Sequence, residues 1–169
     1  MTESAATSDL TMEAIGNAAA LGRQGEQESA RRNLLAIWQQ IGPVGDPLHR
    51  CTLAHYMADL HQEPAEALIW DIRALDAADS LTDDRAQQHH ASLQVAGFYP
   101  SLYLNIADNL RRLSAFEVAA KYIINAKQHS SALPEGPYGA TILEAICEVH
   151  RAIDNRDTVR RDSDPGAAG

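Results

Sequence analysis

The fold is decided by residues 103–126, which read YLNIADNLRRLSAFEVAAKYIINA. Large and small apolar residues recur three or four positions apart in each half of this stretch, which is the periodicity of an amphipathic helix. The first half runs large, small, large, and the second half runs small, large, small. The residues that make this pattern are Tyr103, Ala107, Leu110, Ala119, Ile123 and Ala126. Because alanine lets two helices approach closely, the stretch predicts a tight antiparallel helical hairpin.

Helix start signals recur along the chain. Asp46-Pro47 and Pro64 each have the composition of a helix N-terminus. Ser114 with Glu117 three residues later has the spacing of a capping box, which predicts a helix start at Ser114. The expected helices are residues 11–23, a segment between Gly25 and Gly42, residues 47–61, 64–80 and 83–97, one helix from Pro100, one from Ser114, and a last helix carrying Ile142, Ile146, Val149 and Ile153. The predicted fold class is therefore all-α, a stack of antiparallel helical hairpins with about eight helices.

The hairpin at residues 103–126 resembles the tetratricopeptide repeat (TPR), a helical hairpin of about 34 residues with the same order of large and small positions. A second copy with the same spacings lies near the N-terminus, and Gly25 stands at its turn. Its residues are Ala18, Leu21, Gly25, Ala30, Leu34 and Ile37. A third copy has Ala67 and Ala74 at small positions, but His55 stands where the family has a small residue. The resemblance implies a short, irregular TPR-like α-solenoid.

The copies are unevenly spaced. Ala30 and Ala67 are 37 residues apart, and Ala67 and Ala119 are 52 residues apart. The longer second interval is accounted for by the extra helix expected at residues 83–97.

Composition indicates the limits of the folded domain and excludes some classes of binding partner. Residues 1–9 and 155–169 are polar and are predicted to be disordered tails, which leaves residues 10–154 as a single helical-repeat domain. The net charge of −9 argues against binding to nucleic acid or to an anionic membrane. The N-terminal residues lack the basic and apolar pattern of a signal peptide, and no apolar run approaches the roughly 20 residues of a membrane span. We therefore expect a cytoplasmic protein.

The resemblance implies a function as well as a fold. In the family, the first helices of successive hairpins line a concave groove that binds a protein or peptide, so we expect a non-enzymatic scaffold or interaction module without a cofactor. On the family's register, the expected groove residues are His49, Thr52, Tyr56, Asp59, Ser101, Asn105, Asp108 and Arg112. Asn105, Asp108 and Arg112 share one helical face, and their polar groups suit hydrogen bonding to a peptide. Arg112 is the residue expected to meet a carboxylate.

The sequence is also compatible with two other functions. His55 and Asp59 lie one helical turn apart and face the same way, which is a geometry that can hold a metal in an enzyme or a metal sensor. The apolar stripe of the last helix either caps the stack or pairs with a second copy, which makes a self-associating structural domain the third hypothesis.

Overall fold

The computed structural model describes residues 9–90 and 92–162. Within those ranges the chain forms eight α-helices and two short 3-10 helices and contains no strand, so the expected all-α class is confirmed. The elements are α1 (Leu10–Arg23), α2 (Gln27–Ile41), α3 (Pro47–Asp59), α4 (Pro64–Asp79), α5 (Asp83–His89), η1 (Val95–Gly97), α6 (Tyr99–Arg112), α7 (Phe116–His129), η2 (Ser130–Ala132) and α8 (Pro137–Asp154).

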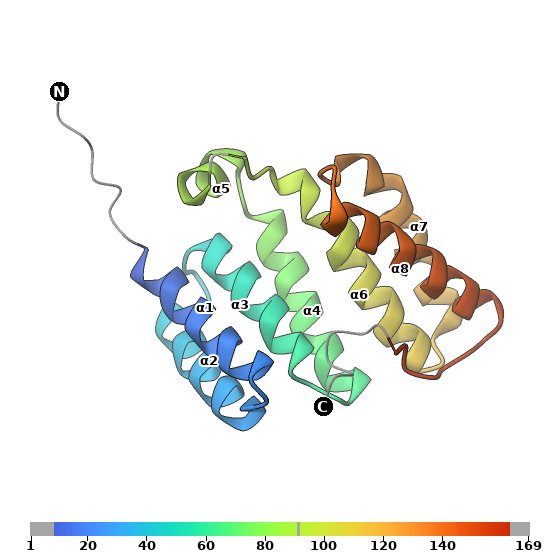
Figure 1. Cartoon of the computed structure of the whole chain (residues 1–169), viewed down its shortest axis with the longest axis horizontal. Coiled ribbons are helices and arrows are strands. Elements are labelled where there is room, and N and C mark those ends of the chain that lie inside the picture. Colours follow the sequence, from blue (N-terminus) through green and yellow to red (C-terminus); the bar gives the residue numbers. More distant parts are fainter. Residues whose placement is uncertain (1–8, 91, 163–169) are drawn as a thin grey trace.

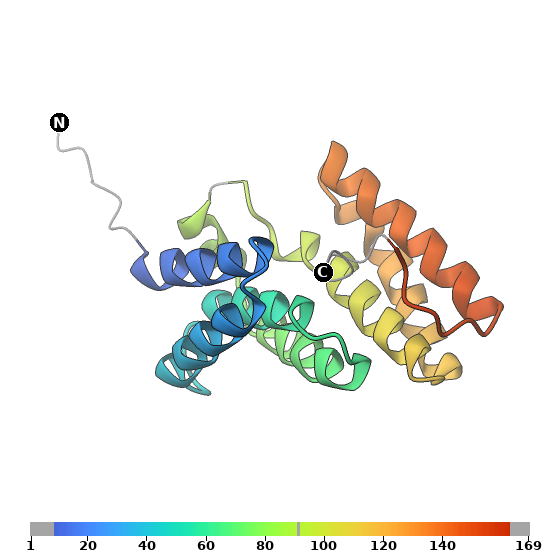
Figure 2. The same ribbon diagram turned by 60° about the horizontal axis from the view of Figure 1, so that its bottom comes forward.

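The long helices stack as hairpins (Figure 1). α1 packs on α2, α3 on α4 and α6 on α7, with short connections within each pair. α3 also contacts α1 and α2, while α4 packs on α6, and these contacts join the three hairpins into one row. α8 lies against α6 and α7 and covers the end of the row (Figure 2).

Close packing within the hairpins depends on alanine. The alanines that the repeat pattern places at small positions are at most 4 % exposed: Ala18, Ala30, Ala67, Ala74, Ala107, Ala119 and Ala126. Helix starts follow local chemistry equally closely. Asp46 accepts a hydrogen bond from the Leu48 amide at 2.8 Å, and Pro47 and Pro64 occupy the first positions of α3 and α4, where no amide donor is needed.

Three helices, α1, α6 and α8, end in the same turn. Gly25, Ser114 and Arg156 have positive φ angles of 89°, 64° and 51°. The amide of the next residue in each case donates back to a carbonyl five residues earlier, as Glu26 does to Leu21 at 3.0 Å. The matching pairs are Ala115 with Leu110 at 2.9 Å and Asp157 with Ala152 at 2.8 Å. This is the Schellman motif, and it reverses the chain after α1 and α6 into the second helix of each hairpin.

Two helix boundaries differ from the expectation. Ser114 does not cap α7: it occupies the left-handed position of the turn after α6, and the residue that precedes α7 is Ala115. The helix expected at residues 83–97 extends only over α5, residues 83–89, and is followed by a loop and by η1. The inserted segment between α4 and α6 is therefore at the expected place but is less helical.

After α8 the described chain continues without regular secondary structure. We call residues 157–161 the C-terminal strap. They belong to the segment expected to be a disordered tail, yet they lie against α6 and α8 through hydrogen bonds from Arg111 and to Glu148. At the other end, Asp9 caps α1, whereas residues 1–8 and 163–169 lie outside the described ranges. Among the described residues, no helix has the length and apolar character required to span a bilayer.

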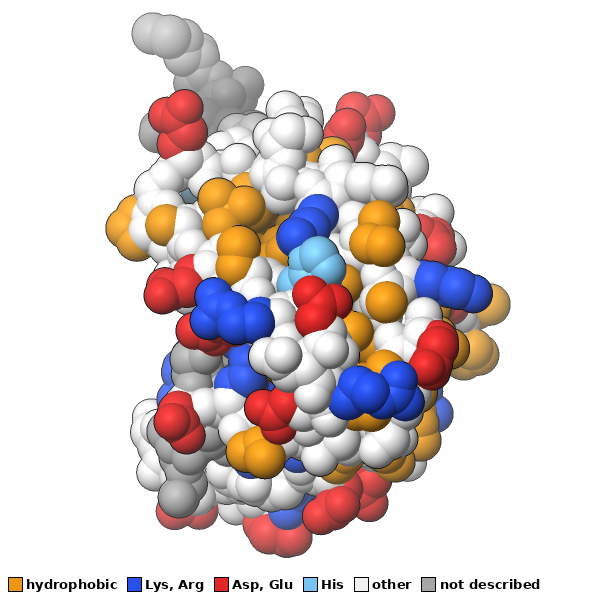
Figure 3. Space-filling view, turned by 90° about the vertical axis from the view of Figure 1, so that its right-hand side faces the viewer, with side chains coloured by type: hydrophobic (Ala, Val, Ile, Leu, Met, Phe, Trp, Pro, Cys, Tyr) orange, Lys and Arg blue, Asp and Glu red, His pale blue; other side chains and the backbone are white. Residues whose placement is uncertain are grey.

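The end of the molecule formed by α7 and α8 has a mixed surface. Val118, Ile124, Tyr138 and Leu143 are each at least 44 % exposed there. In Figure 3, which faces this end, hydrophobic side chains lie singly or in small groups between charged ones. A homodimer through the C-terminal helix therefore stays a prediction, without a continuous apolar face to support it.

Candidate functional site

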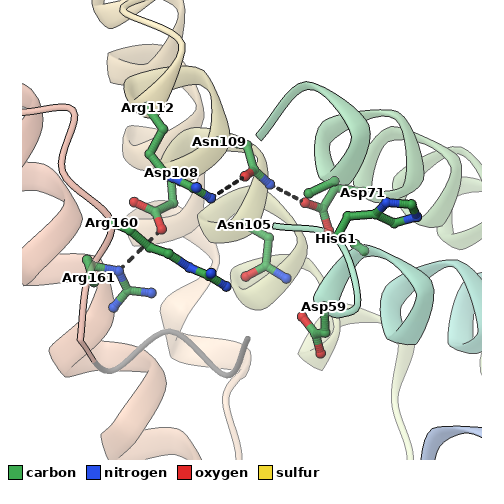
Figure 4. Close-up of a pocket in the computed structure, with 11 residues that line it drawn as sticks. Asp59, His61, Asp71, Asn105, Asp108, Asn109, Arg112, Arg160 and Arg161 are labelled. Atoms are coloured by element: carbon green, nitrogen blue, oxygen red, sulfur yellow. Dashed lines mark hydrogen bonds and ion pairs between the residues drawn. The ribbon is translucent and has the colours of Figure 1, made fainter. Parts of the chain in front are cut away.

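A polar pocket lies where the C-terminal end of α3 meets α4, α6 and the C-terminal strap (Figure 4). We call it the α3–α6 pocket. It is lined by Ala58, Asp59, His61, Ala67, Asp71, Asn105, Asp108, Asn109, Arg112, Arg160 and Arg161. Its free volume is ≈ 40 Å³, which accommodates only a few water-sized atoms. The surrounding side chains, including those of the strap, therefore nearly fill it.

Arg111 on α6 binds the main chain of the strap. Its side chain is completely buried, and its Nε and Nη2 atoms donate to Asp108 Oδ1 at 2.9 and 2.6 Å. Its Nη1 atom donates to the main-chain carbonyls of Asp157 and Val159 at 2.6 and 2.9 Å. A buried guanidinium requires such partners because an unpaired buried charge is costly. The arrangement holds the main chain of the strap by two of its carbonyl groups.

The two arginines of the strap meet acidic and polar groups from three elements. Arg161 donates to Asp108 Oδ2 at 3.3 Å on α6 and to Glu148 Oε2 at 3.1 Å on α8. Arg160 donates to Gln62 Oε1 at 2.5 Å in the connection between α3 and α4. The strap therefore links the last helix to the middle hairpin.

A second set of hydrogen bonds joins α4 to α6 on the other wall of the pocket. Asn109 Nδ2 donates to Asp71 Oδ2 at 2.7 Å, and both residues are buried. Arg112 donates to the carbonyl of Gln62 at 2.9 Å and to Asn109 Oδ1 at 3.5 Å. Arg112, expected to meet a carboxylate from a ligand, is thus engaged within the chain.

Four of the eight residues expected in the groove line this pocket: Asp59, Asn105, Asp108 and Arg112. The other four lie elsewhere. Ser101 is buried and donates to the Phe98 carbonyl at 3.0 Å. Tyr56 packs against the apolar core of the first two hairpins, and Thr52 is half-buried on α3.

His49 belongs to an ionic cluster at the far end of α3. Its Nε2 atom lies 2.8 Å from Asp9 Oδ2, and Arg85 on α5 contacts both Asp9 and Asp46 at 3.2 and 2.6 Å. Burial alone would raise the pKa of Asp9, but hydrogen bonds with His49 and from the Met12 amide outweigh burial and hold it at about 2. This cluster ties α5 to the N-terminal ends of α1 and α3.

The structure offers two candidate metal ligands, His55 and Asp59, rather than a full set of ligands. His55 Nδ1 lies 3.5 Å from Asn105 Nδ2, and Asp59 lines the pocket one turn further along α3. Within residues 9–90 and 92–162, no group of three or more His, Cys, Asp or Glu side chains is arranged to hold a metal. A metal role for His55 and Asp59 stays a hypothesis without a third ligand.

Sequence reasoning missed Arg111, Asp71, Asn109, Arg161 and Glu148. Arg111 had a detectable signal, because it lies four residues after Ala107 and seven after Leu104, and both of these are buried on α6. A charged residue on the buried stripe of a helix requires a partner inside the protein. Arg161 and Glu148 have no comparable signal, because they meet only after the chain has turned at Arg156.

Searches of protein-family models, of curated proteins and of solved structures found no match to this chain. The functional interpretation therefore depends on the site itself.

Proposed function

We propose that this protein is a non-enzymatic binding module that holds a non-helical segment of a protein partner at the α3–α6 pocket. The resemblance to tetratricopeptide repeats favours this function, because that family binds peptides along its first helices. Here the corresponding helices are α3 and α6, which contribute Asp59, Asn105 and Asp108 to the pocket.

One observation carries the proposal. Arg111 holds two carbonyl groups of a segment without regular secondary structure, and it does so from a completely buried position on α6. A contact to main-chain carbonyls recognises the backbone of a segment whatever its side chains are. The side chain of Val159 in that segment is 71 % exposed, so its identity contributes little to the contact. The site thus has the features of a peptide-binding surface.

The proposal is tested with a displayed library of random peptides selected on the full chain. Enriched peptides are expected to lose most of their binding to Asn105→Ala, because Asn105 lines the pocket and is only half-buried. The matched control is Gln128→Ala, which removes an exposed amide on α7, outside the pocket.

Circular dichroism of both variants monitors the fold. If no peptide is enriched, or if enriched peptides bind Asn105→Ala and Gln128→Ala equally well, the pocket is not the binding site.

A further inference from the structure

The end of α8 has the geometry of a hairpin without its second helix. The turn at Arg156 has the same hydrogen bonds as the turns at Gly25 and Ser114, which lead into α2 and α7. After Arg156, however, the chain continues as the C-terminal strap and passes over α6. The strap takes the place of a second helix in the chain order, but it lies at the α3–α6 pocket.

We propose that the strap is an intramolecular ligand of this pocket, and that the partner segment that displaces it is non-helical and carries two consecutive arginines. This inference rests on the proposed function and adds the chemistry of the ligand and a means of controlling access. The strap occupies the site in the free protein and leaves it when the partner binds.

Charge identifies the ligand class. Apart from the strap, the acidic groups around its path are Asp59, Asp71, Asp108 and Glu148, and the basic groups are Arg111 and Arg112. The acidic groups outnumber Arg111 and Arg112. Arg161 of the strap pairs with Asp108 and Glu148, and Arg160 adds a second positive charge to the lining of the pocket, where it donates to Gln62. A competing segment must supply a cation in place of Arg161, because Asp108 is buried and would otherwise keep only Arg111 of these two ion-pair partners.

The strap is held in a way that permits exchange. Its main-chain carbonyls and its two arginines make the contacts, whereas Asp157, Thr158 and Val159 are exposed. No strap residue is among the buried apolar residues of the described core. Its attachment is therefore polar, and another segment of like chemistry can replace these hydrogen bonds one for one.

The displacing segment belongs to another protein rather than to a second copy of this chain. A tethered segment has an effective concentration on the order of 1 mM, far above any micromolar concentration of an identical strap on another molecule. A second copy therefore gains nothing by exchange. A partner gains affinity when its segment continues beyond the two arginines and makes further contacts.

The experiment compares peptide binding to the full chain with and without an intact strap. The probe is a fluorescent peptide with the sequence of residues 155–162, and the variant is Arg160→Ala/Arg161→Ala. For an intrinsic Kd of about 50 µM, competition by a strap at about 1 mM weakens the apparent affinity roughly 20-fold. The variant is therefore expected to bind the peptide at least about 10-fold more tightly than the wild-type chain does.

Two controls isolate the effect. Arg23→Ala/Arg32→Ala removes the same charge from exposed positions on α1 and α2 and should leave peptide binding at the wild-type level. A peptide with alanine in place of Arg160 and Arg161 should fail to bind either protein. Amide hydrogen exchange of residues 157–161 should rise when the wild-type chain is saturated with a tighter library peptide, because the strap leaves the pocket.

The inference is overturned if Arg160→Ala/Arg161→Ala binds the peptide no better than wild type while its circular dichroism spectrum is unchanged. It is also overturned if the variant unfolds and exchange at residues 157–161 does not rise with ligand, because the strap is then a purely structural clasp. A dimer found by light scattering only with the strap intact would identify a second copy as the occupant and contradict the choice of partner.

Failure of this inference and failure of the proposed function give different results. Library peptides that bind in an Asn105-dependent manner would leave the proposed function standing even if the strap variant gains no affinity. The opposite result is that the strap variant binds the peptide more tightly and Asn105→Ala has no effect. This would support the strap as a ligand and contradict the role that the proposed function gives to Asn105.

Discussion

Arg111→Met should be among the most destabilising single substitutions in this protein. Methionine fills much of the same space but removes the four hydrogen bonds that Arg111 donates to Asp108, Asp157 and Val159. Asp108, whose side chain is 8 % exposed, is then left with Arg161 as its remaining ion-pair partner among those described. Removing one partner of a buried ion pair costs about 3–5 kcal/mol, mostly because the other charge stays buried.

The measurement is unfolding by urea and by heat, each followed by circular dichroism at pH 7. For a chain of this size, a loss of about 3–5 kcal/mol corresponds to a fall in Tm of roughly 6–20 °C. Arg112→Met is the matched control, because Arg112 is only half-buried and its described hydrogen bonds reach Gln62 and Asn109. Its cost should be about 1 kcal/mol.

A double variant checks the physical reason. Arg111→Met with Asp108→Leu removes both charges, so no lone buried carboxylate remains, and the double variant should be more stable than Arg111→Met alone. A cost below about 1 kcal/mol for Arg111→Met would refute the reasoning. A double variant that loses the sum of both single effects would refute it as well, because the two residues would then act independently.

Three further outcomes follow from the described residues. Ser114→Gly should raise the free energy of unfolding by about 0.5–1 kcal/mol, and Gly25→Ala should lower it by about 1 kcal/mol. The reason is that both residues have a positive φ and only Gly25 adopts it without strain. Equal changes of the two variants in urea unfolding would contradict this. A thiol reagent should label exposed Cys147 in the native protein and buried Cys51, whose pKa is raised to about 12 by burial, only in urea; mass spectrometry shows the sites. The pKa of Asp9 is lowered to about 2 in the folded protein, below the value near 4 in an unfolded chain, so its stabilising contribution is complete above about pH 4 and is lost as the pH falls through 2. Asp9→Asn, which keeps the capping oxygen, should therefore be less stable than wild type at pH 6 and equal to it near pH 2, and a constant difference would contradict the assignment.

The hairpins were predictable because their signals are local. Proline at a helix start, alanine at a close helix contact and glycine at a positive φ each act within a few residues, and Pro47, Ala107 and Gly25 all behave as the sequence indicated. Ser114 shows where local chemistry misleads. Its hydroxyl suits a helix cap, but the turn that it shares with Gly25 requires a left-handed residue at that position, and the geometry of the turn prevails.

The strap was not predictable because its contacts are polar and distant in sequence. Arg111 is 46 residues from Asp157, and Arg160 is 98 residues from Gln62. Such pairs leave no periodic pattern, and a segment with so few apolar residues has the composition of a disordered tail. The one signal is the position of Arg111 on the apolar stripe of α6, because a charged side chain there requires a partner from another part of the chain.

The presence of a buried arginine at this position favours binding over simple stabilisation. A leucine at residue 111 would continue the apolar stripe of Leu104 and Ala107, and replacing a buried ion pair with apolar residues is often neutral or stabilising. Stability of the stack therefore does not require Arg111 and Asp108. What a leucine cannot do is donate to the carbonyls of a passing main chain, which Arg111 does at 2.6 and 2.9 Å. The charged pair makes physical sense if α6 has to hold the main chain of another segment. The double variant Arg111→Met with Asp108→Leu separates the two roles, because it should keep the fold and lose the peptide.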